Sequence, residues 1–110
     1  MADLELLQGT LDVLVLKSLS GGPRHGYAVA RWIKDTSDDA LTVEDRALYV
    51  SLHRLEERGL IAAEWGLSDN NRKAKFYKLT RAGKKQIERD TRQWEATNAI
   101  MTRFLAANED

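Results

Sequence analysis

The hydrophobic period of the chain changes at Gly59, and this change limits the possible folds more than any other feature. Before Gly59, three leucines recur at spacings of four and three residues, which predicts a helix over residues 45–58 with a narrow core-facing stripe. These leucines are Leu48, Leu52 and Leu55. Gly59 itself is typical of the residue that follows a helix. After it, residues 60–65 and 73–79 alternate with period two around a polar, turn-forming stretch, which predicts a β-hairpin.

Two further helices are predicted ahead of this unit. Residues 4–19 place apolar side chains on two faces, so we expect this helix to be buried on two sides. One face carries Leu4, Leu7, Leu11, Leu14 and Ser18, and the other carries Leu6, Val13 and Leu16. A chain of 110 residues has little to cover both faces, so a second subunit is a reasonable source of cover. Residues 25–36 predict the second helix, whose inward residues are expected to be Tyr27, Ala30 and Ile33.

A long last helix follows the hairpin. Thr80 is a plausible N-cap for a helix over residues 81–107. Its apolar stripe contains Ile87, Trp94, Ile100, Met101, Phe104 and Leu105. Three of these residues are seven apart, a spacing that suits packing along another helix.

The order of elements predicts a winged helix-turn-helix, a mostly α fold with a small β-hairpin. We expect residues 1–80 to form the DNA-binding domain and residues 81–110 to form a dimerisation helix and tail. In such a fold the third helix enters the major groove of DNA, and the hairpin, or wing, reaches a neighbouring backbone or minor groove.

The distribution of charge supports this expectation although the net charge is zero. Residues 44–85 carry ten basic and six acidic side chains, whereas the segments on either side are acidic. A local basic patch is what phosphate binding requires. The candidate DNA-binding residues are Arg46, Tyr49, Val50, His53 and Arg54 on the third helix and Arg72, Lys73 and Lys75 on the hairpin.

Three stretches of the chain resemble the PadR family of bacterial transcription regulators. The first is Gly9-Thr10-Leu11-Asp12 through Leu19, followed by His25-Gly26-Tyr27. The second is Ala47-Leu48-Tyr49 followed by residues 52–61, Leu-His-Arg-Leu-Glu-Glu-Arg-Gly-Leu-Ile. The third is Tyr77-Lys78-Leu79-Thr80-Arg81-Ala82-Gly83. The length is similar to that of the shorter subfamily, which has a single C-terminal helix.

The resemblance implies a homodimeric regulator, usually a repressor, that binds a palindromic operator in double-stranded DNA. It also implies that the last helix packs against the first helix of the partner. The expected dimer interface contains Leu7, Leu11, Leu14, Ile87, Trp94, Met101, Phe104 and Leu105. The chain departs from the family at Arg46 and Val50, because the family usually has a small or hydroxyl residue before Leu-Tyr and a proline after it. The departure bears on the choice of operator sequence.

Several residues keep two interpretations at this stage. Tyr49 either contacts a phosphate or packs at the helix start, and Arg54 either binds phosphate or pairs with Glu57 or Glu44. Trp94 either packs in the core or dimer interface or forms the aromatic wall of an effector pocket near the two-fold axis, for a hydrophobic or aromatic small molecule.

Three other residues have one main interpretation each. His25 is expected to bond a loop carbonyl, and Trp32 and Trp65 are expected at the edge of the core.

The remaining function classes have less support. The chain has no cysteine and two histidines, so we expect no metal site and no cofactor. No nucleophile–base spacing or phosphate-binding loop indicates an enzyme. The longest apolar run is too short to span a membrane, and we expect a cytoplasmic protein with no membrane partner. The zero net charge leaves one alternative, a winged-helix protein-interaction or dimerisation module that does not bind DNA.

Overall fold

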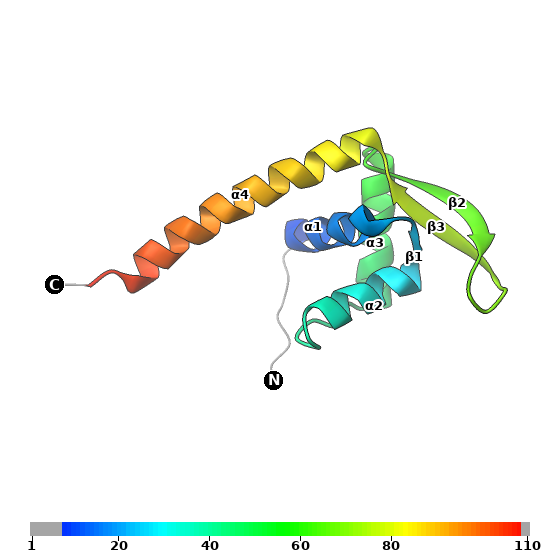
Figure 1. Ribbon diagram of the computed structural model, residues 1–110, viewed down its shortest axis with the longest axis horizontal. Coiled ribbons are helices and arrows are strands. Elements are labelled where there is room, and N and C mark those ends of the chain that lie inside the picture. The colour runs from blue at the N-terminus through cyan, green and yellow to red at the C-terminus, as the bar shows by residue number, and fades with distance from the viewer. Residues whose placement is uncertain (1–7, 109–110) are drawn as a thin grey trace.

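The computed structural model describes residues 8–108 as four α-helices and a small antiparallel sheet (Figure 1). In chain order the elements are α1 (Gln8–Ser18), the short 3-10 helix η1 (Leu19–Gly21), β1 (Arg24–His25), α2 (Gly26–Thr36), α3 (Asp45–Glu57), β2 (Ile61–Leu67), β3 (Lys73–Leu79) and α4 (Arg81–Ala106). The α-helices and the hairpin follow the predicted order, and the mostly helical winged-helix class is confirmed. Leu4, Leu6 and Leu7 lie outside the described residues.

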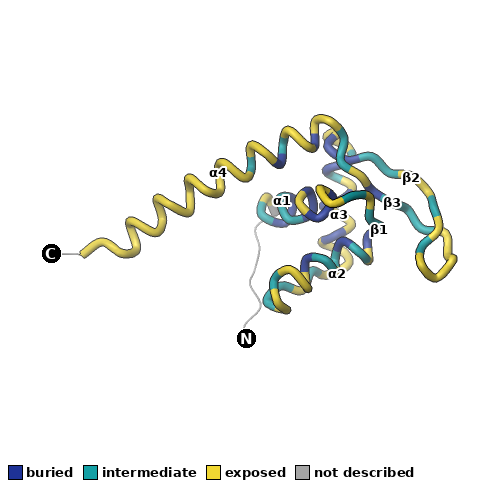
Figure 2. Tube along the Cα trace, viewed as in Figure 1, coloured by how far each residue is buried: buried dark blue, intermediate teal, exposed yellow. Residues whose placement is uncertain are grey.

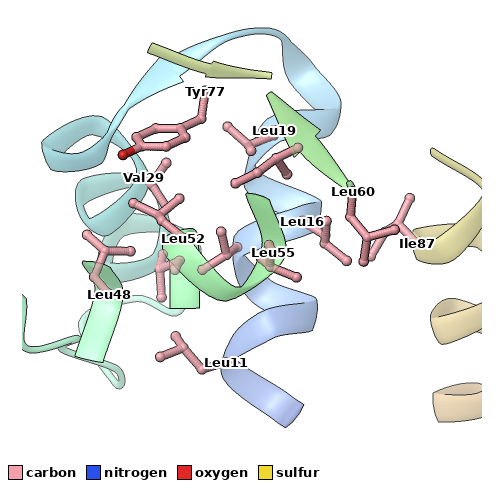
Figure 3. Close-up of a cluster of buried hydrophobic side chains, with 13 residues drawn as sticks. Leu11, Leu16, Leu19, Val29, Leu48, Leu52, Leu55, Leu60, Tyr77 and Ile87 are labelled. Atoms are coloured by element: carbon pink, nitrogen blue, oxygen red, sulfur yellow. The ribbon is translucent and has the colours of Figure 1, made fainter. Parts of the chain in front are cut away.

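Helix α3 passes through the centre of the core (Figure 3). The predicted stripe of Leu48, Leu52 and Leu55 is confirmed, since none of the three is more than 1% exposed. Around it pack Leu11, Val15, Leu16, Leu19, Val29, Ile33, Leu60, Ile61, Tyr77 and Ile87. Burying these apolar side chains is the main contribution to stability, at roughly 25 cal/mol for each Å² removed from water.

The prediction for α2 is wrong at one inward position. Tyr27 is 63% exposed, whereas Val29 is fully buried and Ile33 is nearly so. Positions 29 and 33 are one helical turn apart, so the buried stripe is rotated from the one that we expected. The ring of Tyr27 is therefore free to line a surface groove.

The sheet has the strand order β1-β3-β2, and both pairs are antiparallel. In the hairpin Ile61 pairs with Leu79 and Leu67 with Lys73, so β2 extends two residues past the predicted end at Trp65. Strand β1 was not predicted because two residues are too few to show a period of two. It ties the start of α2 to the middle of the wing, where His25 pairs with Phe76.

The predicted helix ends at the base of the hairpin are confirmed. Gly59 has φ +74°, a conformation that L side chains rarely adopt, and α3 ends just before it. The Thr80 hydroxyl caps α4 by accepting from the Gly83 N–H (3.1 Å) and donates to the Gly59 carbonyl (2.6 Å). A Cβ on Gly83 would lie 2.0 Å from the Leu60 carbonyl oxygen, so only glycine permits this close contact.

Helix α4 extends away from the rest of the chain and points away from the hairpin (Figures 1 and 2). Gly83 and Ile87, near its start, are its buried residues, and every residue from Thr91 to Asn108 is exposed. The molecule is correspondingly long, 62 × 33 × 21 Å. None of the helices within residues 8–108 combines the length and the apolar character that crossing a bilayer requires.

Candidate nucleic-acid interface

The face of α3 opposite its leucine stripe is open to solvent. Arg46, Tyr49, Val50 and His53 are all exposed, as the sequence predicted for a face turned outward. The His53 imidazole lies 3.0 Å from the Glu57 carboxylate, one turn along the same face. This face therefore presents a guanidinium, a phenol, the methyl groups of a valine and an imidazole. Together these groups can contact phosphates and base edges.

Arg54 is half-buried beside this face, and it has a partner on α1 that was not predicted for it. Its guanidinium donates to both carboxylate oxygens of Asp12 on α1, and the Ser51 hydroxyl donates to the same carboxylate at 2.6 Å. Asp12 is buried and Ser51 is fully buried. The hydrogen bonds that Arg54 donates to Asp12 raise the pKa of Arg54 above its ordinary value. The observed contacts assign Arg54 to the joint between α1 and α3 rather than to the outward face.

Tyr49 is held against the start of α2. A Cβ on Gly26 would lie 2.6 Å from the Tyr49 hydroxyl oxygen, so glycine at this position makes room for the ring. His25 caps the same helix end, because its Nδ1 accepts from the Ala28 N–H at 3.2 Å. The predicted bond from His25 to a loop carbonyl is therefore replaced by a bond to an amide. The start of α2, at His25-Gly26-Tyr27, therefore packs against α3 through Gly26.

Two cations of the wing, Lys73 and Lys75, lie on the side that faces α3. Lys73 Nζ lies 5.2 Å from the centre of the Trp65 ring, and Lys75 Nζ lies 5.7 Å from that of Tyr77 and 3.8 Å from the Glu56 carboxylate. Burial, with Glu56 and Tyr49 nearby, raises the pKa of Tyr77. Arg72 is exposed at the turn, where Asn71 adopts φ +61° as its residue type allows. The three predicted wing cations are thus gathered on one strand and its turn.

An open groove of about 540 Å³ separates the wing from α3. It is lined by His25, Gly26, Tyr27, Tyr49, Trp65, Lys73, Ala74, Lys75 and Tyr77. The structure thus brings Tyr49 of α3 together with two of the wing lysines. It also adds Tyr27 and Trp65, which sequence reasoning had placed in the core or at its edge. Trp65 is 62% exposed, and Trp32 alone of that pair lies against the core.

The predicted dimer residues divide into two groups. Leu11 and Ile87 are buried in the core of their own chain, so they offer little surface to a second copy. Leu14 is half-buried, and Trp94, Met101, Phe104 and Leu105 are exposed by 48% or more along α4. Leu7 lies outside the described residues.

Comparisons with known proteins agree with this architecture. The model of the transcriptional regulator PadR-like family matches residues 15–89. A PadR family transcriptional regulator from Eggerthella lenta is 32% identical, with 92% of this chain and 86% of that chain covered and a TM-score of 0.75. A transcriptional regulator from Clostridium thermocellum is 26% identical, with 88% and 91% covered and a TM-score of 0.80. A curated protein from Lysinibacillus sphaericus, described as uncharacterized protein X, is 25% identical over 96% of both chains. This chain belongs to the PadR-like family of transcriptional regulators.

Proposed function

We propose that the protein is a homodimeric, sequence-specific DNA-binding regulator that represses its target genes and is released by a small-molecule effector. The observation that carries the proposal is the shared groove: Tyr49 on the outward face of α3 and the wing lysines Lys73 and Lys75 line the same space. A regulator that only bound another protein would have no need of cations aligned beside an exposed helix face.

The geometry supports one binding mode. The exposed side chains of α3 are presented to base edges in the major groove, with Arg46, Val50 and His53 as the readers of sequence. The wing cations Arg72 and Lys73 contact phosphates of the adjoining backbone, which adds affinity without discriminating between sequences. Arg46 and Val50 are also the positions at which the chain departs from the family, so they are expected to give this protein its own operator preference.

Removing the cations of the wing tests this binding mode. The Arg72→Ala/Lys73→Ala double variant should bind its own upstream DNA about tenfold or more weakly at low salt, because two phosphate contacts are lost. The slope of log affinity against log salt should fall by about two, and the loss should be the same on unrelated DNA. Fluorescence anisotropy of labelled duplexes over a range of salt concentrations measures both quantities.

The matched control is Lys84→Ala/Lys85→Ala, which removes two exposed cations at the start of α4, past the other end of β3 from the turn. Its affinity and salt slope should stay close to those of the wild type. An Arg72→Ala/Lys73→Ala protein that binds like the wild type would exclude the wing. Absence of any wild-type binding at low salt would instead favour the interaction module without DNA binding.

Dimerisation in this proposal rests on α4. Its exposed stripe of Trp94, Ile100, Met101, Phe104 and Leu105 has no cover within the described part of the chain. Apolar stripes of this length are rarely left in water, and a second copy with the same stripe provides matching cover. In the proposed dimer the half-buried Leu14 of α1 lies in the contact between α4 of one subunit and α1 of the other.

The effector is proposed to bind beside Trp94. Two copies of this residue near a two-fold axis would give two aromatic walls, between which a planar or hydrophobic molecule can stack. Such a ligand would favour one arrangement of the two subunits and so change the distance between their recognition helices.

A further inference from the structure

Trp65 is a large apolar side chain in an unexpected environment. It lies on β2, directly opposite Lys75 in the ladder, and 62% of it is exposed. The ammonium of Lys73 lies 5.2 Å from the centre of its ring. An exposed indole costs free energy in water, roughly in proportion to its apolar area. The core does not use this residue, and its ring is one wall of the groove beside α3.

The other walls of the groove are also aromatic and cationic. Tyr27 is 63% exposed and Tyr49 is 51% exposed, and their rings come from α2 and α3 on the far side of the groove from Trp65. Lys73 and Lys75 line the wing side, so the groove combines three exposed rings with two ammonium groups. Alternating aromatic and cationic side chains suit the chemistry of a nucleic-acid strand. Glu56 contacts Lys75 at 3.8 Å, but it is not among the residues that line the groove.

The position of the groove identifies which part of DNA would fill it. When α3 lies in the major groove and the wing reaches the next minor groove, one sugar–phosphate backbone separates the two. That backbone has to cross the space between α3 and the wing. The groove of about 540 Å³ is lined by Tyr49 of α3 and by Trp65, Lys73 and Lys75 of the wing, so it has the position that such a backbone requires.

We propose that Trp65 and Tyr27 are backbone-contacting residues, with the Trp65 ring packed on a deoxyribose and the Tyr27 hydroxyl directed to a phosphate. This inference rests on the proposed DNA-binding function and adds two residues to it. Lys73 and Lys75 contact the neighbouring phosphates. Because sugars and phosphates are the same at every base pair, Trp65 supplies affinity and no sequence discrimination.

The affinity test uses Trp65→Ala and Trp65→Phe with labelled duplexes of the upstream DNA and of unrelated sequence. Trp65→Ala should bind both duplexes about tenfold more weakly, in line with the loss of one aromatic contact to a strand. The ratio of the two affinities should not change, and Trp65→Phe should recover part of the loss. The salt slope should also stay at the wild-type value, because the substitution removes no charge. Trp32→Phe, at the edge of the core, is the control and should match the wild type.

A spectroscopic test reports the contact directly. The Trp32→Phe/Trp94→Phe protein keeps Trp65 as its single tryptophan, and the Trp65→Phe/Trp94→Phe protein keeps Trp32. Saturating DNA should protect Trp65 from quenching by acrylamide, a neutral quencher, and should leave the quenching of Trp32 unchanged. The Trp32 protein shows that any protection is local to the groove.

Each alternative outcome overturns a stated part of the proposal. Trp65 would be excluded from the interface if DNA binds the wild type, leaves the quenching of Trp65 unchanged, and binds Trp65→Ala within twofold of the wild-type affinity. The proposed function would then remain intact. A flattened salt slope in Trp65→Ala would mean that Trp65 acts by holding Lys73. A changed ratio of specific to non-specific affinity would contradict the assignment to the backbone. Absence of wild-type binding would overturn this inference together with the proposed function.

Discussion

At the scale of single residues, Asp12 joins the two helices on which the proposed function depends. It is 42 positions from Arg54 and 39 from Ser51 in the sequence, yet it receives hydrogen bonds from both. A buried carboxylate is stable only when such partners compensate for the loss of water. Asp12 therefore fixes how the recognition helix sits on α1, and α1 is a predicted part of the dimer interface.

Replacing Asp12 should cost stability as well as alignment. We expect Asp12→Ala to lower the free energy of unfolding by about 2 kcal/mol, because the buried Ser51 hydroxyl loses its acceptor and the Arg54 guanidinium loses its bonds to Asp12. Urea denaturation at a fixed protein concentration measures the change. The control is Asp35→Ala, whose ion pair with Arg31 is about two-thirds exposed and should be worth less than about 0.5 kcal/mol. Equal losses in the two variants would contradict the role assigned to Asp12.

At the scale of elements, α3 and α4 differ in how much of each the sequence explains. In α3 the leucine stripe accounts for burial, and Val50 is the sixth residue of a helix that begins at Asp45. The family's proline at this position would be expected near a helix start, because proline has no N–H to donate inside a helix. A period of 3.6 indicates the leucine stripe of α3, but it could not indicate what Arg46 and Val50 recognise.

Helix α4 supplies the element-scale prediction. Met101→Glu/Phe104→Glu should convert a dimer into a monomer, because four glutamates would face an apolar contact across the two-fold axis. Sedimentation velocity at micromolar concentration measures the change in mass. Ala99→Glu/Ala106→Glu adds the same charge to the opposite face of the same helix and should remain dimeric. A wild-type protein that sediments as a monomer would refute the proposed assembly.

At the scale of the whole molecule, local periodicity predicted the helices, the hairpin and their order. It failed where the determining contacts are distant or short. Strand β1 has two residues, and Asp12 and Arg54 are 42 positions apart in the sequence, so neither feature leaves a local signal. Trp65 was placed at the core edge because a period of two assigns residues to a face without saying how far the core extends under it. The DNA contacts and the effector stay predictions, because periodicity does not identify a ligand.

The effector prediction belongs to this scale, since it concerns two subunits. Titration with a panel of planar aromatic compounds should change tryptophan emission and weaken DNA binding in parallel, because the ligand favours one subunit arrangement. Trp94→Ala, measured alongside, should lose the emission change while Trp32 and Trp65 still report folding. A response that persists in Trp94→Ala, or emission that no compound alters, would exclude this pocket.

The seat of α4 has a mechanical consequence. The helix is fixed at one end, where the Gly83 backbone lies against the Leu60 carbonyl, and its last buried residue is Ile87. Its 26 residues span about 39 Å, so a rotation of about 5° at the seat moves the far end by about 3 Å. The helix is a lever whose fulcrum is at the base of the wing. A second subunit or a ligand that applies a force near Trp94 or Phe104 acts far from this fulcrum. The force therefore exerts a large torque on the joint between the recognition helix and the hairpin.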